Sequence, residues 1–413
     1  ALINFIRRIT VEGKIIMKST PVKGTADYLP RQTLLRDYLQ GVILETYRCA
    51  GFERILTPAI EDMENLEKSD GGDKLDAALA TGDAGSLCDL GLRYDLTLPL
   101  SRFYANNRAK LLSPFKCIQI DKAYRAERPQ KGRMREFIQC DIDIIGSSSP
   151  LCELELIHTT AAALLKLRFT VRVNDRKVLR GILRYAGVAE GLMDTVCVTL
   201  DKWDKIGEDG VMDELAGKDI APAVTEKLRA ALSGKTLESV KACCAETEAL
   251  ARLEQLIADA EGLAGGQYSV VFDPLLVRGQ GYYTGTVFEI ASDQYKGSVA
   301  GGGRYDGLVG KFTGEDIPAV GFSIGFERIF QILESQGFAI PGQRRRVALF
   351  CNDGEGAAAL KAADSLREAG YSVGLFPRPK KLGKFLGRLE EQGFDGYLVC
   401  GEGTEPKWLG GSE

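Results

Sequence analysis

Apolar and polar residues alternate along two neighbouring stretches in the first third of the chain. Residues 114–127 (PFKCIQIDKAYRAE) and 135–146 (REFIQCDIDIIG) place apolar side chains at nearly every second position, as in β-strands with one buried face. Between them lies a basic, glycine-containing segment, RPQKGRMR, at 128–135. The pattern predicts an antiparallel hairpin with positive charge concentrated at its loop.

The stretches before this hairpin predict a helix and shorter strands. Residues 31–50 carry apolar positions at helical spacing. Residues 52–62 predict a short strand that is interrupted at Pro58. Residues 90–107 predict a strand, then a turn, then a helix that begins near Pro99.

The pattern changes between about Asn174 and Gly266, where amphipathic helices with few β-branched residues replace the strands. This segment predicts a helical insertion. Strand-like sequence resumes at 268–277 and 281–292. A linker rich in Pro, Gly and Arg then precedes a βαβ-like tail.

Together these elements predict an α+β fold, with a largely antiparallel sheet flanked by helices and a small α/β domain at its end. The length of 413 residues is too great for one ordinary core. We assign residues 1–173 and 267–338 to two parts of one main domain. Residues 174–266 form the insertion, and residues 344–413 form the C-terminal domain.

The composition, with 45% hydrophobic and 27% charged residues, is that of a globular protein. A net charge of −4 gives no overall attraction to nucleic acid or anionic lipid, so a polyanion must be bound by a local basic patch. No apolar stretch approaches the roughly 20 residues that span a bilayer. Glu12 interrupts the short N-terminal apolar runs, which makes a poor secretion signal. We therefore expect no membrane association.

Ten cysteines are scattered without a CxxC pair, and the single histidine is His158. A zinc site or a disulfide framework is therefore not expected, and we assign no metal ligand. Scattered thiols favour a reducing, cytoplasmic location. His158 lies in a helix-like apolar run, which predicts a place on a helix face or in the core and excludes histidine acid–base catalysis.

The arginines of the hairpin have the chemistry of an anion site. Planar guanidinium groups suit bidentate contacts to phosphate or carboxylate oxygens, and a strand–loop–strand can present several of them to one ligand. Phe137 could offer a flat face to a purine base. A solvated basic loop remains the alternative. The basic side chains in or beside the loop are Arg125, Arg128, Lys131, Arg133 and Arg135.

The second strand of the hairpin carries polar residues on one face. Gln139, Asp141 and Asp143 alternate with apolar residues and therefore point to the same side. The hairpin thus predicts a phosphate clamp, a base-stacking residue and a pocket lined by acceptors, one after the other.

The sequence of this hairpin resembles a motif of a known enzyme family. YRAERPQKGRMREF is similar to motif 2 of the class II aminoacyl-tRNA synthetases, in the form typical of the histidyl-tRNA synthetase family. Six motifs of that family lie in the expected order over roughly residues 21–335, and together they are specific. The other five stretches are VKGTADYLP (N-terminal signature), the helix ending in GFERILTP (motif 1), VRGQGYYTGTVFE and GSVAGGGRYDGLVGKF (histidine motifs) and AVGFSIGFERI (motif 3).

The resemblance implies the class II antiparallel sheet and an ATP site. Arg125 would bind the α-phosphate, and Arg278 would be the catalytic arginine between the carboxylate and the α-phosphate. Phe137 and Arg328 would sandwich the adenine. The implied ATP-binding residues are Arg125, Glu127, Arg133, Phe137 and Arg328.

The resemblance also implies a histidine site. Asp95, Thr97 and Gln139 would fix the α-ammonium group, whereas Asp143 and two tyrosines would surround the imidazole. The implied histidine-binding residues are Asp95, Thr97, Gln139, Asp143, Arg278, Tyr282, Tyr283, Gly301 and Tyr305.

The implied activity is ATP-dependent formation of histidyl adenylate and transfer of histidine to tRNA(His). The attacking carboxylate is already ionised, so no protein base is needed, and arginines with Mg²⁺ can neutralise the phosphate charge. Motif 1 implies a homodimer through the helix at residues 31–50. The tail resembles the family's anticodon-binding domain, and its basic helix could contact phosphates.

Two departures from the family pattern stand out. Gln280-Gly281 replaces the usual Leu-Asp before the paired tyrosines, and Asp143 stands where many relatives carry Glu. The C-terminal domain also ends sooner than is usual in the family. For the basic helix of this domain, a solvated basic face is the alternative to RNA contact, and base readout of the anticodon is not assigned.

Two other functions stay open. One is a catalytically inactive histidine-binding paralogue that acts as the regulatory subunit of ATP phosphoribosyltransferase. The retained arginines (Arg125, Arg133, Arg278 and Arg328) argue against it. The other is an adenylate-forming enzyme that no longer charges tRNA.

Overall fold

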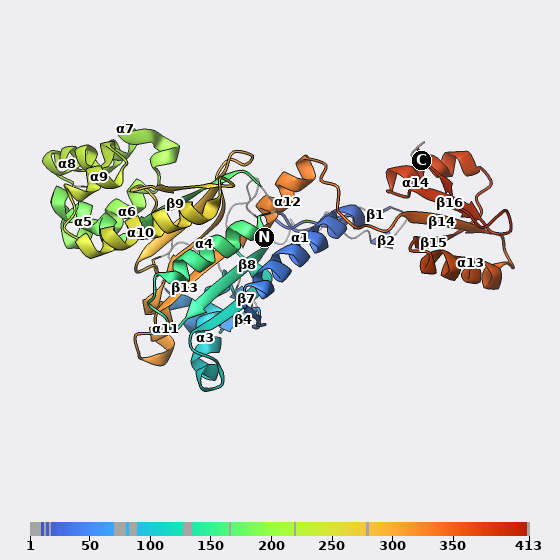
Figure 1. Cartoon of the computed structure of the whole chain (residues 1–413), viewed down its shortest axis with the longest axis horizontal. Helices are drawn as coiled ribbons and strands as arrows, with labels where there is room; N and C mark the ends of the chain where they lie inside the picture. Colours follow the sequence, from blue (N-terminus) through green and yellow to red (C-terminus); the bar gives the residue numbers. More distant parts are fainter. Residues whose placement is uncertain are drawn as a thin grey trace. The chain divides into compact units, whose positions relative to one another are not determined.

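The computed structural model describes residues 10–11, 14–15, 18–69, 80–81, 89–126, 134–164, 167–218, 220–277 and 281–410. The chain divides into two compact units (Figure 1). The large unit comprises Ala1–Asp27 and Leu39–Ser335, and the small unit comprises Tyr28–Tyr38 and Gln336–Glu413. Helix α1 (Pro30–Cys49), which confirms the first predicted helix, contributes residues to both.

A mixed sheet forms the centre of the large unit, with eight strands among the described residues. In spatial order the strands are β10 (Ser269–Phe272), β9 (Phe169–Asp175), β11 (Thr286–Ser292), β12 (Ser298–Arg304), β13 (Ala319–Gly325), β8 (Glu136–Ile145), β7 (Phe115–Tyr124) and β3 (Glu53–Arg54). Only the two edge pairs, β10 with β9 and β3 with β7, are parallel among these strands. The α+β class and the antiparallel β7–β8 hairpin are therefore confirmed.

Helices of the large unit pack against this sheet. Helix α4 runs along β8 and β13, and α10 runs along β9 and β10, as Figure 1 shows. His158 lies exposed on α4, as expected for a helix-face residue. Besides α1, the α-helices of the large unit that lie outside the insertion in the described residues are α2 (Met63–Glu67), α3 (Thr97–Asn107), α4 (Leu151–Ala163), α11 (Asp306–Thr313) and α12 (Phe326–Ser335).

The segment predicted as an insertion is helical in the structure. The helices are α5 (Arg176–Ala186), α6 (Met193–Leu200), α7 (Trp203–Ala216), α8 (Pro222–Ser233), α9 (Leu237–Lys241) and α10 (Thr247–Ala264). Asp175, the last residue of β9, caps α5 by accepting a hydrogen bond from the amide of Lys177 at 2.7 Å. The boundaries of the four predicted segments stay predictions.

Two predicted elements differ in detail. The interrupted strand at 52–62 is two short strands in different sheets, because β3 pairs with β7 whereas β4 (Ile60–Asp62) pairs with β6 (Leu90–Leu92). Strand β5 (Ala80–Thr81) also pairs with β6, and β1 (Thr10–Val11) pairs with β2 (Lys14–Ile15). Helix α3 begins at Thr97, two residues before Pro99. Proline is tolerated there because the backbone N–H groups in the first turn of a helix make no intrahelical hydrogen bond.

The small unit confirms the βαβ pattern of the tail. Its sheet has the order β15 (Ser372–Pro377), β14 (Arg346–Cys351), β16 (Gly396–Val399), β17 (Lys407–Trp408). Val347 and Leu349 pack on the side of α13 (Gly356–Glu368), whereas Ala348 and Phe350 pack on the side of α14 (Leu382–Glu391). This alternation buries both faces of β14.

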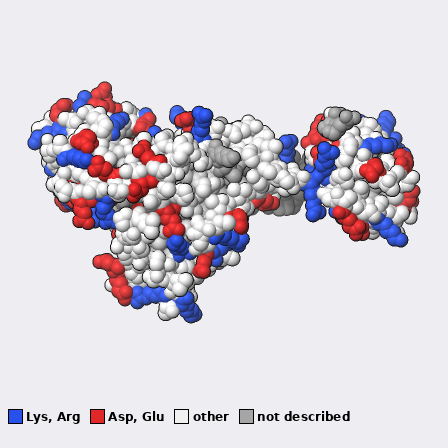
Figure 2. Space-filling view, viewed as in Figure 1, with Lys and Arg blue, Asp and Glu red and all other residues white. Residues whose placement is uncertain are grey.

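Charge is distributed without a dominant sign. On the face shown in Figure 2, basic and acidic side chains are interspersed over the chain, in keeping with the small net charge. In the part of the chain that the structure describes, no helix has both the length and the apolar character needed to cross a membrane.

Candidate active site

A cavity of about 360 Å³ lies against β8, β12 and β13, at the centre of the large unit. It brings together predicted residues that are up to 231 positions apart, from Thr97 to Arg328. The predicted residues that line it are Thr97, Arg125, Phe137, Gln139, Asp143, Tyr282, Tyr283, Gly301, Tyr305 and Arg328. The predictions for Glu127, Arg133 and Arg278 lie outside the described residues.

Strand β8 supplies one wall of the cavity through Gln139, Asp141 and Asp143. All three side chains are buried, and they share one face of β8, as the alternation of the sequence predicted. The Tyr305 hydroxyl donates a hydrogen bond to Asp143 Oδ1 at 2.7 Å. Two buried acceptors, Asp143 Oδ2 and Gln139 Oε1, have no hydrogen-bond partner within the described chain. A ligand with two donors would satisfy both.

Glycines of the neighbouring strands make room for this wall. A Cβ atom built on Gly321, which pairs with Asp143 across β13 and β8, would lie 1.9 Å from Asp143 Oδ1. A Cβ on Gly302 of β12 would lie 2.0 Å from the backbone oxygen of Gly321. Gly302 therefore requires glycine for steric reasons, and Gly321 requires it as long as the Asp143 carboxylate keeps this position.

Three tyrosines close another side of the cavity. The rings of Tyr282 and Tyr283 are 4.9 Å apart between centroids, and the ring of Tyr305 is 6.1 Å from that of Tyr282. The prediction of one strand over 281–292 is wrong in its first half, because β11 begins only at Thr286. Consecutive residues of a strand point to opposite faces, whereas Tyr282 and Tyr283 both line the cavity.

The segment that precedes α3 carries Asp95 and Thr97. Asp95 is buried; its Oδ1 accepts a hydrogen bond from the Leu98 amide at 3.2 Å, and its Oδ2 accepts one from the Tyr282 hydroxyl at 3.4 Å. Asp95 does not itself line the cavity, but it joins the start of α3 to a tyrosine that does. Its turn role and its predicted site role are thus compatible.

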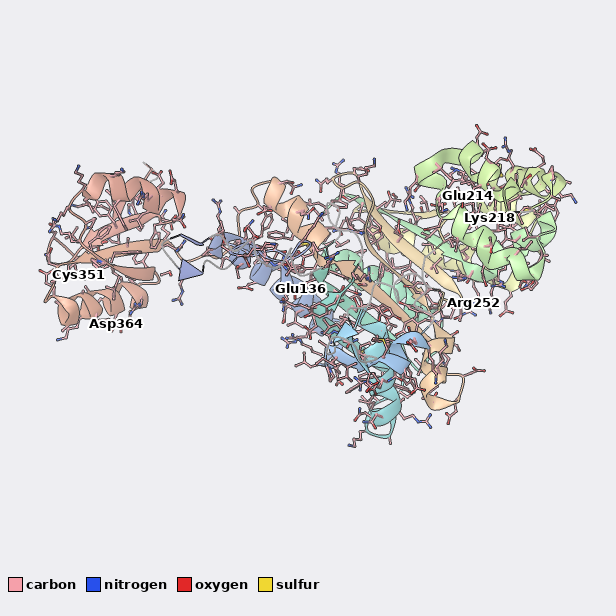
Figure 3. The ribbon with its side chains drawn as sticks, turned by 180° about the vertical axis from the view of Figure 1, so that it is seen from behind. Glu136, Glu214, Lys218, Arg252, Cys351 and Asp364 are labelled. Carbon is pink, nitrogen blue, oxygen red and sulfur yellow. The ribbon has the colours of Figure 1, made fainter. Side chains whose placement is uncertain are left out.

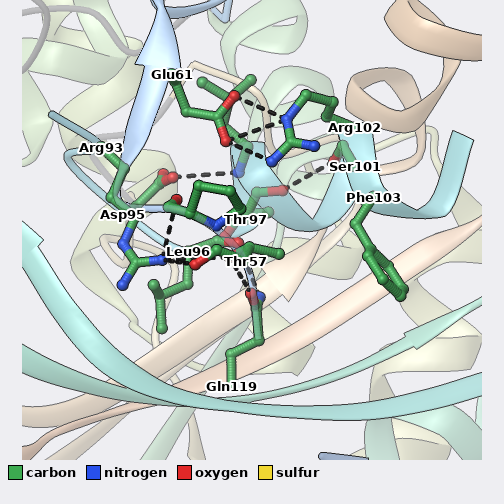
Figure 4. Close-up of polar contacts among 12 residues, drawn as sticks. Thr57, Glu61, Arg93, Asp95, Leu96, Thr97, Ser101, Arg102, Phe103 and Gln119 are labelled. Atoms are coloured by element: carbon green, nitrogen blue, oxygen red, sulfur yellow. Dashed lines mark hydrogen bonds and ion pairs between the residues drawn. The ribbon is translucent and has the colours of Figure 1, made fainter. Parts of the chain in front are cut away.

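The Arg93 side chain lies beside this segment and anchors it (Figure 4). Its guanidinium, almost wholly buried, donates to the backbone oxygens of Thr57 at 2.9 Å and Lys122 at 2.8 Å. It also forms an ion pair with Asp121 at 2.9 Å. The same figure shows a neighbouring pair, in which Arg102 reaches Glu61 at 2.7 Å. Sequence analysis missed this network, because nothing local in LRYDLT shows which carbonyl groups Arg93 will meet.

The far end of the cavity holds the aromatic and arginine residues predicted for the nucleotide. The Arg125 guanidinium carbon lies 4.8 Å from the centroid of the Phe137 ring, and its Nε donates to the Tyr94 carbonyl at 3.1 Å. Arg328 donates to the carbonyl oxygen and the hydroxyl of Ser298. One face of Phe137 is therefore covered by Arg125, and a stacked base would use the other face or displace the guanidinium.

The carboxyl groups of the cavity resist ionisation. Burial raises the pKa of Asp141 to about 7, with a further contribution from the Asp95 carboxylate. Burial, and then the charge of Asp141, raise the pKa of Asp143 well above its ordinary value. Burial also raises the pKa of the Tyr282 and Tyr305 hydroxyls, which stay neutral donors. Such a pocket gains most from a ligand that brings positive charge.

Several cavity residues were not assigned from the sequence. Strand alternation placed Asp141 on the face of Gln139 and Asp143, but no ligand role was assigned to it. Ser323 and Gly321 reach the cavity only through the pairing of β13 with β8, which local sequence does not reveal. The remaining described residues of the lining include Met134, Asp201, Glu289 and Glu327.

Solved structures share this architecture. A histidyl-tRNA synthetase from Nostoc sp. PCC 7120 superimposes with a TM-score of 0.76 over 92% of this chain and 91% of that one, at 28% identity. A protein from Bacillus halodurans C, described as an ATP phosphoribosyltransferase regulatory subunit/histidyl-tRNA synthetase, gives 0.77 over 94% and 99%. Its 23% identity shows the fold alone. The fold is that of the class II aminoacyl-tRNA synthetases.

Sequence comparisons give the family. The chain matches the family model described as Histidyl-tRNA synthetase over residues 24–329. A relative named histidine–tRNA ligase from Leifsonia xyli subsp. xyli is 41% identical over 93% of this chain and 96% of its own length. One of the same name from Phocaeicola vulgatus is 36% identical over 92% and 91%. The chain belongs to the histidyl-tRNA synthetase family.

Proposed function

We propose that this protein is a histidine–tRNA ligase, which activates histidine with ATP as histidyl adenylate and transfers it to tRNA(His). The relatives that carry this name cover nearly the whole chain at 34–41% identity. Within the structure, one observation supports the substrate best. Gln139 Oε1 and Asp143 Oδ2 are buried acceptors without partners in the described residues, and histidine brings two donors, an α-ammonium and an imidazole N–H.

Selectivity follows from these acceptors. An apolar amino acid of similar size would leave Asp143 and Tyr305 without a ligand partner in a buried site. Sites of this kind discriminate by factors of about 10⁴–10⁵, because unsatisfied buried polar groups cost free energy. Asp143 would accept from the imidazole, with Tyr283 and Tyr305 around the ring. Asp95, Thr97 and Gln139 would hold the α-ammonium.

The reaction needs alignment and charge neutralisation. The histidine carboxylate attacks the α-phosphorus of ATP, pyrophosphate leaves, and no proton is transferred to the protein. Arg125 stands at the cavity wall where it can neutralise the α-phosphate. Glu127, Arg133, Phe137 and Arg328 would bind the rest of the nucleotide, and Arg278 would bridge the carboxylate and the phosphate.

Magnesium would accompany the ATP. Mg²⁺ binds through one or two protein carboxylates together with phosphate oxygens and water, and two glutamates, Glu289 and Glu327, line the cavity and fit that role. When bound, the ion would offset part of the phosphate charge.

We also propose a homodimer that works in the cytoplasm. Large apolar side chains at Leu56, Ile60 and Leu90 are 70%, 51% and 43% exposed, beside the motif 1 segment, and a second copy would cover them. Light scattering should give the molar mass of two chains. A mass of one chain at micromolar concentration would rule the dimer out.

In the small unit, residues 344–413 would bind the anticodon arm of the tRNA. The support for this proposal is the βαβ fold together with the basic residues in and before α14, which suit phosphate contacts. These residues are Arg378, Lys380, Lys381, Lys384 and Arg388.

The activity is tested by pyrophosphate exchange into ATP, with each of the twenty amino acids supplied singly. We expect exchange with histidine alone. Histidine binding without exchange would favour the regulatory paralogue, for which the comparisons give no better support. Charging of tRNA(His) in a second assay separates a ligase from an enzyme that only forms the adenylate.

Replacing Gly321 by alanine is expected to raise the KM for histidine in this assay about 10²-fold. The new Cβ would displace the Asp143 carboxylate from its position beside Tyr305, and misplacement of about 1 Å costs on that order. The matched control is Gly307→Ala in α11, where the nearest atom to a new Cβ is 3.9 Å away. Equal KM values for the two variants would contradict the steric argument.

A further inference from the structure

The amide of Gln139 is held in one orientation by its neighbours. Its Nε2 donates to both oxygens of Asp141, at 3.4 and 3.3 Å, and to the Ser323 hydroxyl at 3.3 Å. These contacts use the NH₂ side of the amide, and they leave the carbonyl oxygen Oε1 buried without a partner among the described residues. Asp141 itself is 4% exposed and belongs to the cavity lining.

The orientation of this amide decides what Gln139 can bind. With NH₂ turned to Asp141, the side chain offers an acceptor, which suits an ammonium group. With the amide reversed, it would offer two donors, which would repel an ammonium. An ionised carboxylate can only accept, so Asp141 excludes the reversed orientation, whereas a serine hydroxyl can donate as well as accept and does not.

We propose that Asp141 is a positioning residue for the amino-acid substrate, which fixes the Gln139 amide so that its carbonyl oxygen accepts from the α-ammonium group. This inference rests on the proposed function for the identity of the ligand. It adds to the site a residue that contacts Gln139 rather than the substrate.

The charges around Asp141 make this role dependent on pH. The charged groups around Asp141 are Asp95 before α3, Asp143 on β8 and Arg125 just after β7. The charge of Asp141 also raises the pKa of the Tyr47 hydroxyl on α1, in addition to the larger effect of burial. A protonated Asp141 could donate to Gln139 Oε1 and so permit the reversed amide. Because burial raises the pKa of Asp141 to about 7, the carboxylate forms as the pH rises from about 6 to 8. Histidine affinity should rise over the same interval.

The test compares wild type with Asp141→Ala and Asp141→Asn. Calorimetry gives the Kd for histidine, and pyrophosphate exchange gives KM and kcat. We expect Asp141→Ala to raise Kd and KM about 10–30-fold, the loss of one charge-assisted hydrogen bond, with kcat nearly unchanged. Asp141→Asn should give a smaller loss, because its carbonyl can still accept from Gln139.

The dependence of histidine affinity on pH distinguishes the proposed role of Asp141 from a purely structural one, which would leave that dependence unchanged. Wild-type affinity should rise from pH 6 to 8 more steeply than that of Asp141→Asn, while the imidazole of histidine titrates equally in both. The matched control is Asp364→Asn on α13, which Figure 3 labels. Its carboxylate is exposed and pairs with Arg367. Its Kd and pH profile should equal those of wild type.

Three outcomes would overturn the inference: an unchanged Kd in Asp141→Ala, a loss confined to kcat, or parallel pH profiles of wild type and Asp141→Asn. A different result, the absence of pyrophosphate exchange, would contradict the proposed function. If wild type binds histidine but exchanges no pyrophosphate, the ligase proposal falls, and the Kd values still decide the role of Asp141. If wild type binds no histidine, both fall. Thermal unfolding checks that each variant is folded at the temperature of the binding and exchange assays.

Discussion

Replacing Arg93 by methionine is expected to lower the free energy of unfolding by about 3–5 kcal/mol, because the change removes one partner from a buried charged network. Methionine fills much of the volume but leaves the carbonyl groups of Thr57 and Lys122 without their donor. Asp121 would lose its ion-pair partner as well, although it is partly solvated. Urea denaturation of the full chain measures the change.

The matched control is Arg108→Met. Arg108 pairs with Glu315 at 2.8 Å, but both side chains are largely exposed, so its loss should cost less than about 1 kcal/mol. Similar losses for the two variants would show that burial of the Arg93 guanidinium is not what stabilises the segment before α3.

Replacing Arg125 by alanine is expected to lower kcat for pyrophosphate exchange about 10²–10³-fold, the usual effect of removing a preorganised group that stabilises transition-state charge. Arg125 is held in place by Tyr94 and Phe137 before any ligand binds, so little reorganisation is needed. Arg125→Lys should recover only a small part of the rate, since an ammonium cannot make bidentate contacts. The Kd for histidine should change little.

The control for this variant is Arg252→Ala on α10. Arg252 is exposed and donates to the Ser148 carbonyl at 3.1 Å, and Figure 3 shows its place in the helical part of the large unit. Without tRNA in the assay its exchange rate should equal that of wild type. A comparable loss in both variants would mean that Arg125 acts through stability alone.

Much of this site could be predicted because its chemistry follows local pattern. The alternation along residues 135–146 fixes which side chains share a face, and the structure confirms that Gln139, Asp141 and Asp143 do. The motifs also predicted ten of the residues that line the cavity, Thr97 and Tyr305 among them, although these residues lie far apart in the sequence.

What could not be predicted depends on pairing between distant strands. The contacts of Ser323 with Gln139 and of Gly321 with Asp143 arise because β13 pairs with β8, across more than 170 residues of chain. The partners of the buried Arg93 guanidinium come from two separate segments, Thr57 in one and Asp121 with Lys122 of β7 in the other. Alternation predicted a strand at Tyr282 and Tyr283, but these residues precede β11, and both of them line the cavity.

The two glycines beneath the pocket constrain how its specificity could evolve. Gly302 faces a backbone oxygen, so no change in a neighbouring side chain can relieve the clash of a larger residue there. Gly321 faces the Asp143 side chain, so a larger residue becomes acceptable once Asp143 has been replaced by a smaller one. A mutational path toward another amino acid is therefore ordered: Asp143 must change first, Gly321 can follow, and Gly302 stays fixed throughout.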